Sequence, residues 1–388
     1  MLIEEEDFKN WEKLSQRCDL LDELTFIEKE KTKRSFLFLR DEFGKDFLNK
    51  AFNEGHPICW YILNQAPWTR RWIAYLADML SEVKNKNGYN DLLERIKDKD
   101  RFGEGFSVLE NAYKFSKAGL DISFDPEIKV YTKIKKPDLK LIDKNNKEEL
   151  FVEISNLNTS IQMKEVEETN MPIFMCLMKY ASYLSFCVHI YKVIYQIHLN
   201  DIVRELENKI KKSIEENIFQ ELIEKNVIEI GIAPKTNEKL LKNWALHRGL
   251  TIGEIIGPPI EVDEIFRIRQ KIANEQKQLP IDYSNILIIG NNQPQLITGF
   301  DYENIKEKLI EIIYKHSKLL FIIIFNKYQS FGENNYEFSI KNDYIYVRKN
   351  IPNLFSTEQY LVIINKYCRE KEKINYAFSL ANSFLGRN

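Results

Sequence analysis

The sequence predicts an α/β fold in which a mixed, partly parallel sheet is flanked by helices and preceded by a helical N-terminal domain. Three observations predict this fold. Apolar and aromatic residues recur at helical spacing through residues 1–98. Short alternating segments typical of strands follow between residues 120 and 155. From about residue 262 onward, helical patterns alternate with very apolar strands, as in a parallel sheet with helical crossovers.

The composition is that of an ordinary globular chain. Of its 388 residues, 44% are hydrophobic and 29% are charged, so the chain can bury a large core. The net charge of −2 gives no global attraction to a polyanion, and any nucleic-acid surface must therefore be local. The five cysteines are scattered, without a CxxC pair or clustered histidines. This argues against a disulfide framework and a zinc site, and it favours a reducing cytoplasm.

One apolar stretch, residues 173–191, has to be weighed as a membrane span. Lys179 interrupts this stretch and Lys192 follows it. Because a lysine in the middle of a span is costly in lipid, we expect a buried helix here and no membrane partner. The acidic N-terminal sequence also lacks the basic start and apolar run of a signal peptide.

We expect two domains: a helical domain over residues 1–98 and an α/β domain over residues 99–388, with a largely helical insertion at about 156–260. The insertion and the N-terminal helices are the natural places for target recognition or for homodimer formation. In the first domain, Trp68 and Trp72 could stack on bases, but tryptophans four residues apart on a helix more often pack, which is the interpretation we favour. Near the end of the chain we expect a helix after Ser356.

A hairpin between residues 138 and 155 carries the side chains that could form a catalytic site. Asn145-Asn146 suits the centre of a tight turn. Asp138 and Glu153 each lie seven residues from the nearer asparagine, so they are expected to be direct cross-strand neighbours with Cβ atoms about 5 Å apart. The period of two places the acids on one face and a continuous apolar set on the other. That apolar set is Leu139, Leu141, Leu150, Val152 and Ile154.

Two carboxylates at this separation repel each other and raise a pKa unless a proton or a cation lies between them. A divalent ion would relieve the repulsion. Mg²⁺ prefers a few carboxylate oxygens together with water and substrate phosphate, and Mn²⁺ could replace it. The alternative is a solvent-exposed acidic pair that is compensated by Lys140 or Lys136. On spacing alone the two interpretations stand equal.

These segments resemble a known family. The helical segment 103–119, KKPDLKLID with Asp138, and LFVEIS with Glu153 resemble the PD-(D/E)XK nucleases of the restriction-endonuclease-like fold. The resemblance covers residues 100–156 and, loosely, the later helices and strands. It implies a restriction-endonuclease-like mixed sheet and Mg²⁺-dependent hydrolysis of phosphodiester bonds in nucleic acid, with DNA favoured over RNA. In the family the helix supplies a further acid, for which Glu110 is preferred here and Glu104 is the alternative.

One position departs from the family's pattern. The family's lysine should follow Glu153 by two residues, where this chain has Ser155. A later helical segment, RIRQKIANEQKQLP, resembles the lysine- and glutamine-bearing helix of some nucleases of the superfamily. The candidate replacements are Lys271, Lys277 and Gln278 from that segment, and Lys140 from the face that carries Asp138.

The resemblance assigns a role to each candidate. Asp138, Glu153, the Ile154 carbonyl and Glu110 would hold one or two Mg²⁺ or Mn²⁺ ions, and a lysine would orient the attacking water. The lysines between residues 129 and 140 could contact a nucleic-acid backbone, or they could simply solubilise a strand edge. Two rival functions remain: an inactive nuclease-fold protein that binds nucleic acid or regulates, which Ser155 favours, and a helical scaffold, which the near-neutral charge favours.

Overall fold

The computed structural model describes residues 5–130, 133–157, 161–258, 264–291, 302–329, 336–341 and 343–386. The chain forms two compact units. The first combines Met1–Asn158 with Glu264–Asn388, and the second is Thr159–Asp263. The boundary expected at residue 98 therefore has no counterpart, because the N-terminal helices belong to the same unit as the large sheet.

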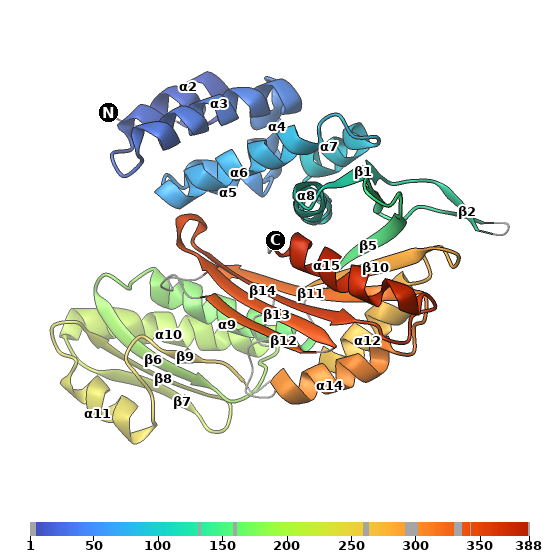
Figure 1. Cartoon of the computed structure of the whole chain (residues 1–388). Coiled ribbons are helices and arrows are strands. Elements are labelled where there is room, and N and C mark those ends of the chain that lie inside the picture. Colours follow the sequence, from blue (N-terminus) through green and yellow to red (C-terminus); the bar gives the residue numbers. More distant parts are fainter. Residues whose placement is uncertain are drawn as a thin grey trace. The chain divides into compact units, whose positions relative to one another are not determined.

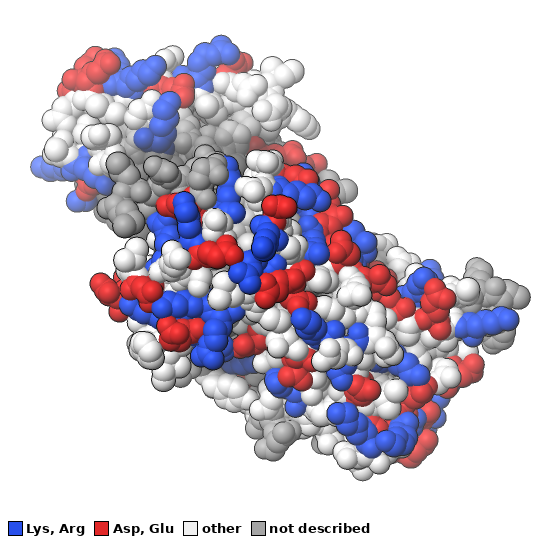
Figure 2. Space-filling model, turned by 90° about the horizontal axis from the view of Figure 1, so that it is seen from above, with Lys and Arg blue, Asp and Glu red and all other residues white. Residues whose placement is uncertain are grey.

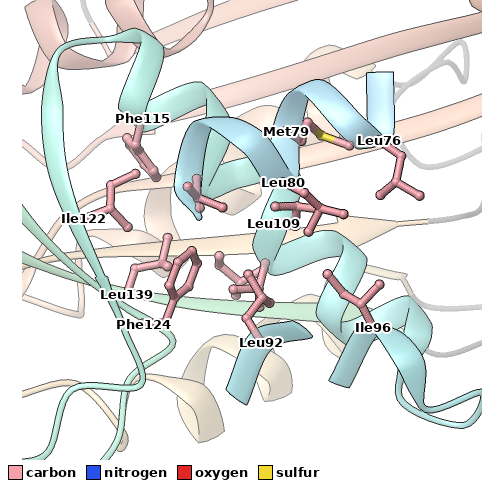
Figure 3. Close-up of a cluster of buried hydrophobic side chains, with 14 of the residues drawn as sticks. Leu76, Met79, Leu80, Leu92, Ile96, Leu109, Phe115, Ile122, Phe124 and Leu139 are labelled. Carbon is pink, nitrogen blue, oxygen red and sulfur yellow. The ribbon is translucent and has the colours of Figure 1, made fainter. Parts of the chain in front are cut away.

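The first unit begins with helices that pack onto the start of the sheet. They are α1 (Glu5–Phe8), α2 (Trp11–Arg17), α3 (Phe26–Phe43), α4 (Phe47–Glu54), α5 (Ile58–Leu63), α6 (Pro67–Val83), α7 (Tyr89–Lys97) and α8 (Phe102–Lys117), with a 3₁₀ turn η1 (Cys18–Leu20). Figure 3 shows how the two parts share a core: Leu80 of α6 and Leu92 of α7 lie in one cluster with Ile122 and Leu139 from the sheet. This shared core explains why these helices are not a separate domain.

The large sheet has eight strands in the order β1-β4-β5-β10-β11-β14-β13-β12. The strands are β1 (Leu120–Phe124), β4 (Leu139–Asp143), β5 (Glu149–Leu157), β10 (Ser284–Asn291), β11 (Leu319–Gln329), β12 (Tyr336–Lys341), β13 (Tyr344–Ile351) and β14 (Ser356–Ile364). The pairs β5–β10 and β10–β11 are parallel, and the other neighbours are antiparallel. The predicted α/β fold with a mixed sheet is therefore confirmed.

Helices cover both faces of this sheet (Figure 1). On one face, α8 and α15 (Ile374–Phe384) pack against residues such as Ile286 and Phe321. On the other face, α12 (Glu264–Glu275) and α14 (Tyr302–Ile313) pack against the alternate residues, among them Leu287 and Ile322. The strands β10 and β11 are thus buried on both sides, which is why their central residues, 286–289 and 319–325, are all apolar. The expected start of the α12 helix, Val262, lies outside the described residues.

The expectation of a helix directly after Ser356 is wrong. That segment is β14, all of whose residues are buried, and the C-terminal helix α15 starts only at Ile374. The sequence misleads because β14 opens with polar residues, Ser356 to Gln359, that a buried strand rarely contains. Short 3₁₀ turns, η2 (Pro352–Leu354) and η3 (Lys371–Lys373), precede these two elements. A small ribbon of β2 (Ile128–Val130) and β3 (Lys133–Lys135) lies outside the large sheet.

The second unit is an α/β unit, in which helices account for more of the described residues than strands do, but which also contains a sheet. Its strands form a four-stranded sheet in the order β7-β8-β6-β9. Its elements are α9 (Ile161–Met178), β6 (Leu184–Ile190), α10 (Gln196–Glu216), β7 (Gln220–Glu224), β8 (Ile228–Pro234), α11 (Lys239–His247) and β9 (Ile255–Ile256). The apolar stretch 173–191 is not one buried helix, because it runs from the end of α9 into the buried strand β6. Among the described residues, no helix is both long enough and apolar enough to cross a membrane.

Charged side chains are mixed over the face of the molecule that Figure 2 shows, where lysine and arginine lie among aspartate and glutamate. This mixture agrees with the net charge of −2. Because neither sign of charge dominates this face, individual clusters of charged residues are more informative than the potential of the whole surface.

Candidate active site

The hairpin of β4 and β5 has the predicted register. Leu139 pairs with Val152 and Leu141 with Leu150. The predicted apolar face is buried, with Ile154 its most exposed member at 7%. The turn itself differs from the expectation, because the residue with positive φ is Lys147 and neither of the two asparagines. The register nevertheless holds, since the alternation of apolar residues fixes which side of each strand faces the core.

Asp138 lies just before β4 and is tied to the strand that carries Glu153. The Ile154 backbone N–H donates a hydrogen bond of 2.7 Å to Asp138 Oδ2. The Asp138 backbone carbonyl accepts a bond of 3.0 Å from the Asp125 N–H, at the end of β1. The Asp138 carboxylate is therefore held by the backbone of β5, and the Asp138 backbone is held next to the end of β1, which together fix the carboxylate beside Glu153.

Glu153 has a carboxylate oxygen with no protein partner. Its Oε2 is buried and makes no hydrogen bond within the described part of the chain. Burial, together with the nearby carboxylates of Asp138 and Glu275, raises the pKa of Glu153 to about 9. Burial also raises the pKa of Asp138 to about 7, although the Ile154 N–H and Arg95 act in the opposite direction. Without a cation, the pair therefore retains at least one proton at neutral pH.

A buried arginine reaches this pair from the N-terminal helices. Arg95 of α7 has a side chain that is 6% exposed, and its Nη1 lies 3.6 Å from Asp138 Oδ1. The same guanidinium donates to Asp125 Oδ2 at 2.7 Å and to Glu104 Oε1 at 3.2 Å. The sequence analysis missed Arg95 and Asp125. Asp125 follows a predicted strand, but nothing in the sequence indicates that α7 packs beside β1.

Of the two candidate helix acids, Glu104 contacts the Arg95 guanidinium that lies beside Asp138, whereas the preferred Glu110 has other partners. Glu110 is buried and forms an ion pair of 2.7 Å with Lys327 of β11. The Tyr75 hydroxyl donates to the same oxygen at 3.5 Å. Six residues separate Glu104 and Glu110, which places them about 120° apart around the helix, so only one of them can face Asp138.

The helix α12 brings Lys271 to the acid pair. Lys271 Nζ lies 2.9 Å from Glu275 Oε1, and the Ser155 hydroxyl donates to the same oxygen at 3.1 Å. Lys271 is close enough to Glu153 for its positive charge to oppose the rise in the pKa of that carboxyl. Ser155 stands where the family has its lysine. It thus contacts Glu275, which also pairs with Lys271 of α12. Glu275 is a further residue that the sequence analysis missed, although its spacing of four from Lys271 is a signal for an ion pair on a helix.

The other basic candidates lie elsewhere. Lys140 forms an ion pair of 2.6 Å with Glu149, towards the turn of the hairpin. Lys277 and Gln278 are exposed beyond the end of α12, where Lys277 Nζ donates to Asn274 Oδ1 at 3.2 Å. Of the lysines near β2 and β3, Lys136 pairs with Glu127 at 2.7 Å. The structure therefore brings together Asp138, Glu153 and Lys271, with Arg95, Glu104 and Glu275 around them.

The raised pKa values predict a pH-dependent stability. Because the pKa of Glu153 is raised in the folded protein, its carboxyl keeps a proton at pH values above 4.5, where the same carboxyl in the unfolded chain has lost it. The free energy of unfolding should therefore fall as the pH rises through this window. Glu153→Gln cannot ionise, and at pH 8 we expect it to be more stable than the wild type by up to about 5 kcal/mol. Urea denaturation at several pH values in EDTA measures the effect.

Glu149→Gln is the matched control, because Glu149 lies on the same strand and face but outside the acid pair. We expect its pH dependence to follow that of the wild type. Equal slopes for the wild type and Glu153→Gln would show that the Glu153 carboxyl is not perturbed.

The donors suit a small, hard cation. Two carboxylates and a backbone carbonyl leave coordination positions for water and phosphate, as Mg²⁺ prefers. In the part of the chain that the structure describes, no group of three or more His, Cys, Asp or Glu is arranged to hold a metal ion. Any ion at the pair would therefore depend on Asp138 and Glu153. No family model matches the chain, and neither a curated protein nor a solved structure matches it.

Proposed function

We propose that this chain is a metal-dependent nuclease that hydrolyses phosphodiester bonds in nucleic acid. The observation that carries the proposal is the buried, unpartnered Oε2 of Glu153, which lies beside Asp138 and within reach of the charge of Lys271. A buried carboxylate oxygen without a partner is costly, and a divalent cation would remove that cost. The preference for DNA over RNA rests on the family resemblance.

The order of the elements supports the same proposal. The helix α8, the strand β1 and the hairpin β4–β5 are followed, after the second unit, by α12 and β10. β5 and β10 are parallel neighbours. This is the order of helix, strand, hairpin, helix and strand on which the resemblance to the restriction-endonuclease-like fold depends.

Each residue of the site has a distinct task in this proposal. Asp138, Glu153 and the Ile154 carbonyl would hold the ion, which when bound lowers the pKa of water and offsets charge on the phosphate. The Ile154 N–H keeps the Asp138 carboxylate oriented. Lys271, steadied by Glu275, would donate a hydrogen bond to the attacking water or to a phosphate oxygen. Arg95 would limit the repulsion between Asp138 and the acids around it.

A second candidate function is nucleic-acid binding without cleavage. It is favoured by Arg95, whose guanidinium already provides Asp138 with a counter-ion. It is also favoured because, among the described residues, no third His, Cys, Asp or Glu is placed to hold a metal ion together with the pair. In that case the arginine would replace the metal. Such a protein would bind nucleic acid in EDTA as well as it does in Mg²⁺.

Incubation of the full chain with double-stranded DNA, single-stranded DNA and RNA tests the proposal. We expect cleavage with Mg²⁺ or Mn²⁺, none with EDTA, and recovery when the metal is restored. Retention of uncleaved nucleic acid in every condition would support the binding protein. If the chain neither binds nor cleaves any of these substrates, the nuclease proposal is wrong.

A further inference from the structure

The first unit contains a cavity that the acid pair does not use. Its volume is about 290 Å³, and residues of α5, α6, α8, β5 and β11 line it. Asn156 of β5 is one lining residue and lies three positions beyond Glu153, on the other face of the strand. Its volume is close to the lower end of the range for small-molecule pockets, about 300–1,000 Å³, which suits a ligand no larger than one or two rings.

Half of the lining residues are aromatic, and several of their rings contact one another. Tyr61 and Trp72 stack with ring centroids 3.6 Å apart and an interplanar angle of 8°. Trp68 and Phe355 approach to 5.6 Å, and both are only partly buried at the edge of the cavity. Rings held in this way offer flat faces on which a planar ligand stacks with little loss of side-chain entropy.

The polar groups of the cavity are few, and two of them have no partner. The hydroxyls of Ser107 and Ser356 are buried and make no hydrogen bond within the described residues. Their side chains are 7% and 6% exposed, and both line the cavity. The ion pair of Glu110 and Lys327 lies in the same wall. Buried hydroxyls normally make hydrogen bonds, so the two serine hydroxyls without partners indicate a ligand with polar atoms on its edge.

We propose that this cavity binds a nucleobase, which stacks on Trp68 and Phe355 and forms hydrogen bonds with the hydroxyls of Ser107 and Ser356. A sugar is a poorer fit, because half of the lining residues are aromatic and hydroxyl groups lie all around a sugar ring. An aliphatic ligand would leave the serine hydroxyls unpaired. The base can belong to a free nucleotide or to a nucleic-acid strand. This inference does not depend on cleavage by Asp138 and Glu153.

Quenching of tryptophan fluorescence tests the proposal, since Trp68 and Trp72 line the cavity. The full chain is titrated in EDTA with AMP, GMP, CMP and TMP, and with ribose 5-phosphate as the probe that lacks a base. In a second arm it is titrated with single-stranded DNA that carries one 2-aminopurine, and with the same strand carrying an abasic site. If the mononucleotides bind, the bound base belongs to a free nucleotide. If the 2-aminopurine strand binds and the mononucleotides do not, the bound base belongs to a nucleic-acid strand.

The double variant Ser107→Ala with Ser356→Ala separates a ligand role from a structural one. We expect base-bearing probes to bind about tenfold more weakly, because two hydrogen bonds are lost. The thermal midpoint should not fall, since neither hydroxyl has a protein partner to lose. Trp68→Leu should weaken binding as well, whereas Ser81→Ala, on the exposed surface of α6, should leave it unchanged.

Three results would overturn the proposal. The first is binding of ribose 5-phosphate or the abasic strand as tightly as the base-bearing probes. The second is an absence of binding by all base-bearing probes at millimolar concentration. The third is a double serine variant that binds like the wild type. A chain that binds bases but never cuts would contradict only the nuclease proposal, so the two failures are distinguishable.

Discussion

Asp138→Asn should lower metal-dependent cleavage of nucleic acid by at least about 100-fold, the usual cost of removing one electrostatic contribution in an active site. The substitution keeps the size of the side chain and an oxygen that can accept from the Ile154 N–H. It removes the negative charge with which the residue would hold a cation. Initial rates of cleavage in Mg²⁺ and in Mn²⁺ measure the effect.

Circular dichroism and the thermal midpoint should show that the Asp138→Asn variant remains folded. Asp121→Asn is the matched control, because Asp121 lies on β1 of the same sheet and pairs with Lys86 away from the site. We expect this control to cut at nearly the wild-type rate. An Asp138→Asn variant that is folded and cuts as fast as the wild type would exclude Asp138 from the chemistry.

Lys271→Met should lower the cleavage rate by about 10²–10⁴-fold, the range for losing a group that acts on a proton in the transition state. The ammonium of Lys271 is the cation that α12 brings towards Glu153. Methionine retains the apolar part of the side chain and removes its charge. Arg269→Met, on the exposed face of the same helix, should have little effect.

A second substitution tests the interpretation of Ser155. Ser155→Lys in the Lys271→Met background should restore part of the lost activity. The reason is that Glu275 Oε1 already accepts a hydrogen bond from residue 155 and would hold an ammonium there. Rescue would mean that the basic group can be supplied from either element. If Lys271→Met is fully active, the role of Lys271 on α12 is wrong. If the double variant is no better than Lys271→Met alone, position 155 cannot supply the basic group.

The hairpin was predictable from sequence because its geometry is local. The period of two and a short turn determine that Leu139 faces Val152, and they do so whichever residue of the turn adopts positive φ. The acid pair follows directly from this register. The alternation of helices and apolar strands likewise predicted the mixed sheet, since each buried strand must be covered on both faces.

The surroundings of the pair were not predictable, because they depend on packing between distant elements. Four basic or amide residues were candidates, and only the crossing of α12 over β5 selects Lys271. Arg95 reaches Asp138 from a helix that the sequence assigns to another domain. The sequence offers no periodicity that would reveal such a contact.

The error at Ser356 and the ion pair of Glu110 have a common physical origin. Glu358 of β14 is 3% exposed and lies 3.2 Å from Lys349, 3.5 Å from Lys327 and 3.8 Å from Lys114. Glu110 joins this buried set of charges through Lys327. Charged residues that pair inside a core resemble surface residues in the sequence, so a buried strand was mistaken for a helix, and the ion pair of Glu110 was not foreseen.

The placement of the second unit between β5 and α12 has a consequence for synthesis of the protein. A ribosome that has completed the hairpin must add about 120 further residues before Lys271 is made, which at roughly 5–20 residues per second takes on the order of 10 s. During that interval the nascent chain carries the two acids without their lysine. If Lys271 is as necessary as we propose, the growing polypeptide cannot cleave nucleic acid during that interval.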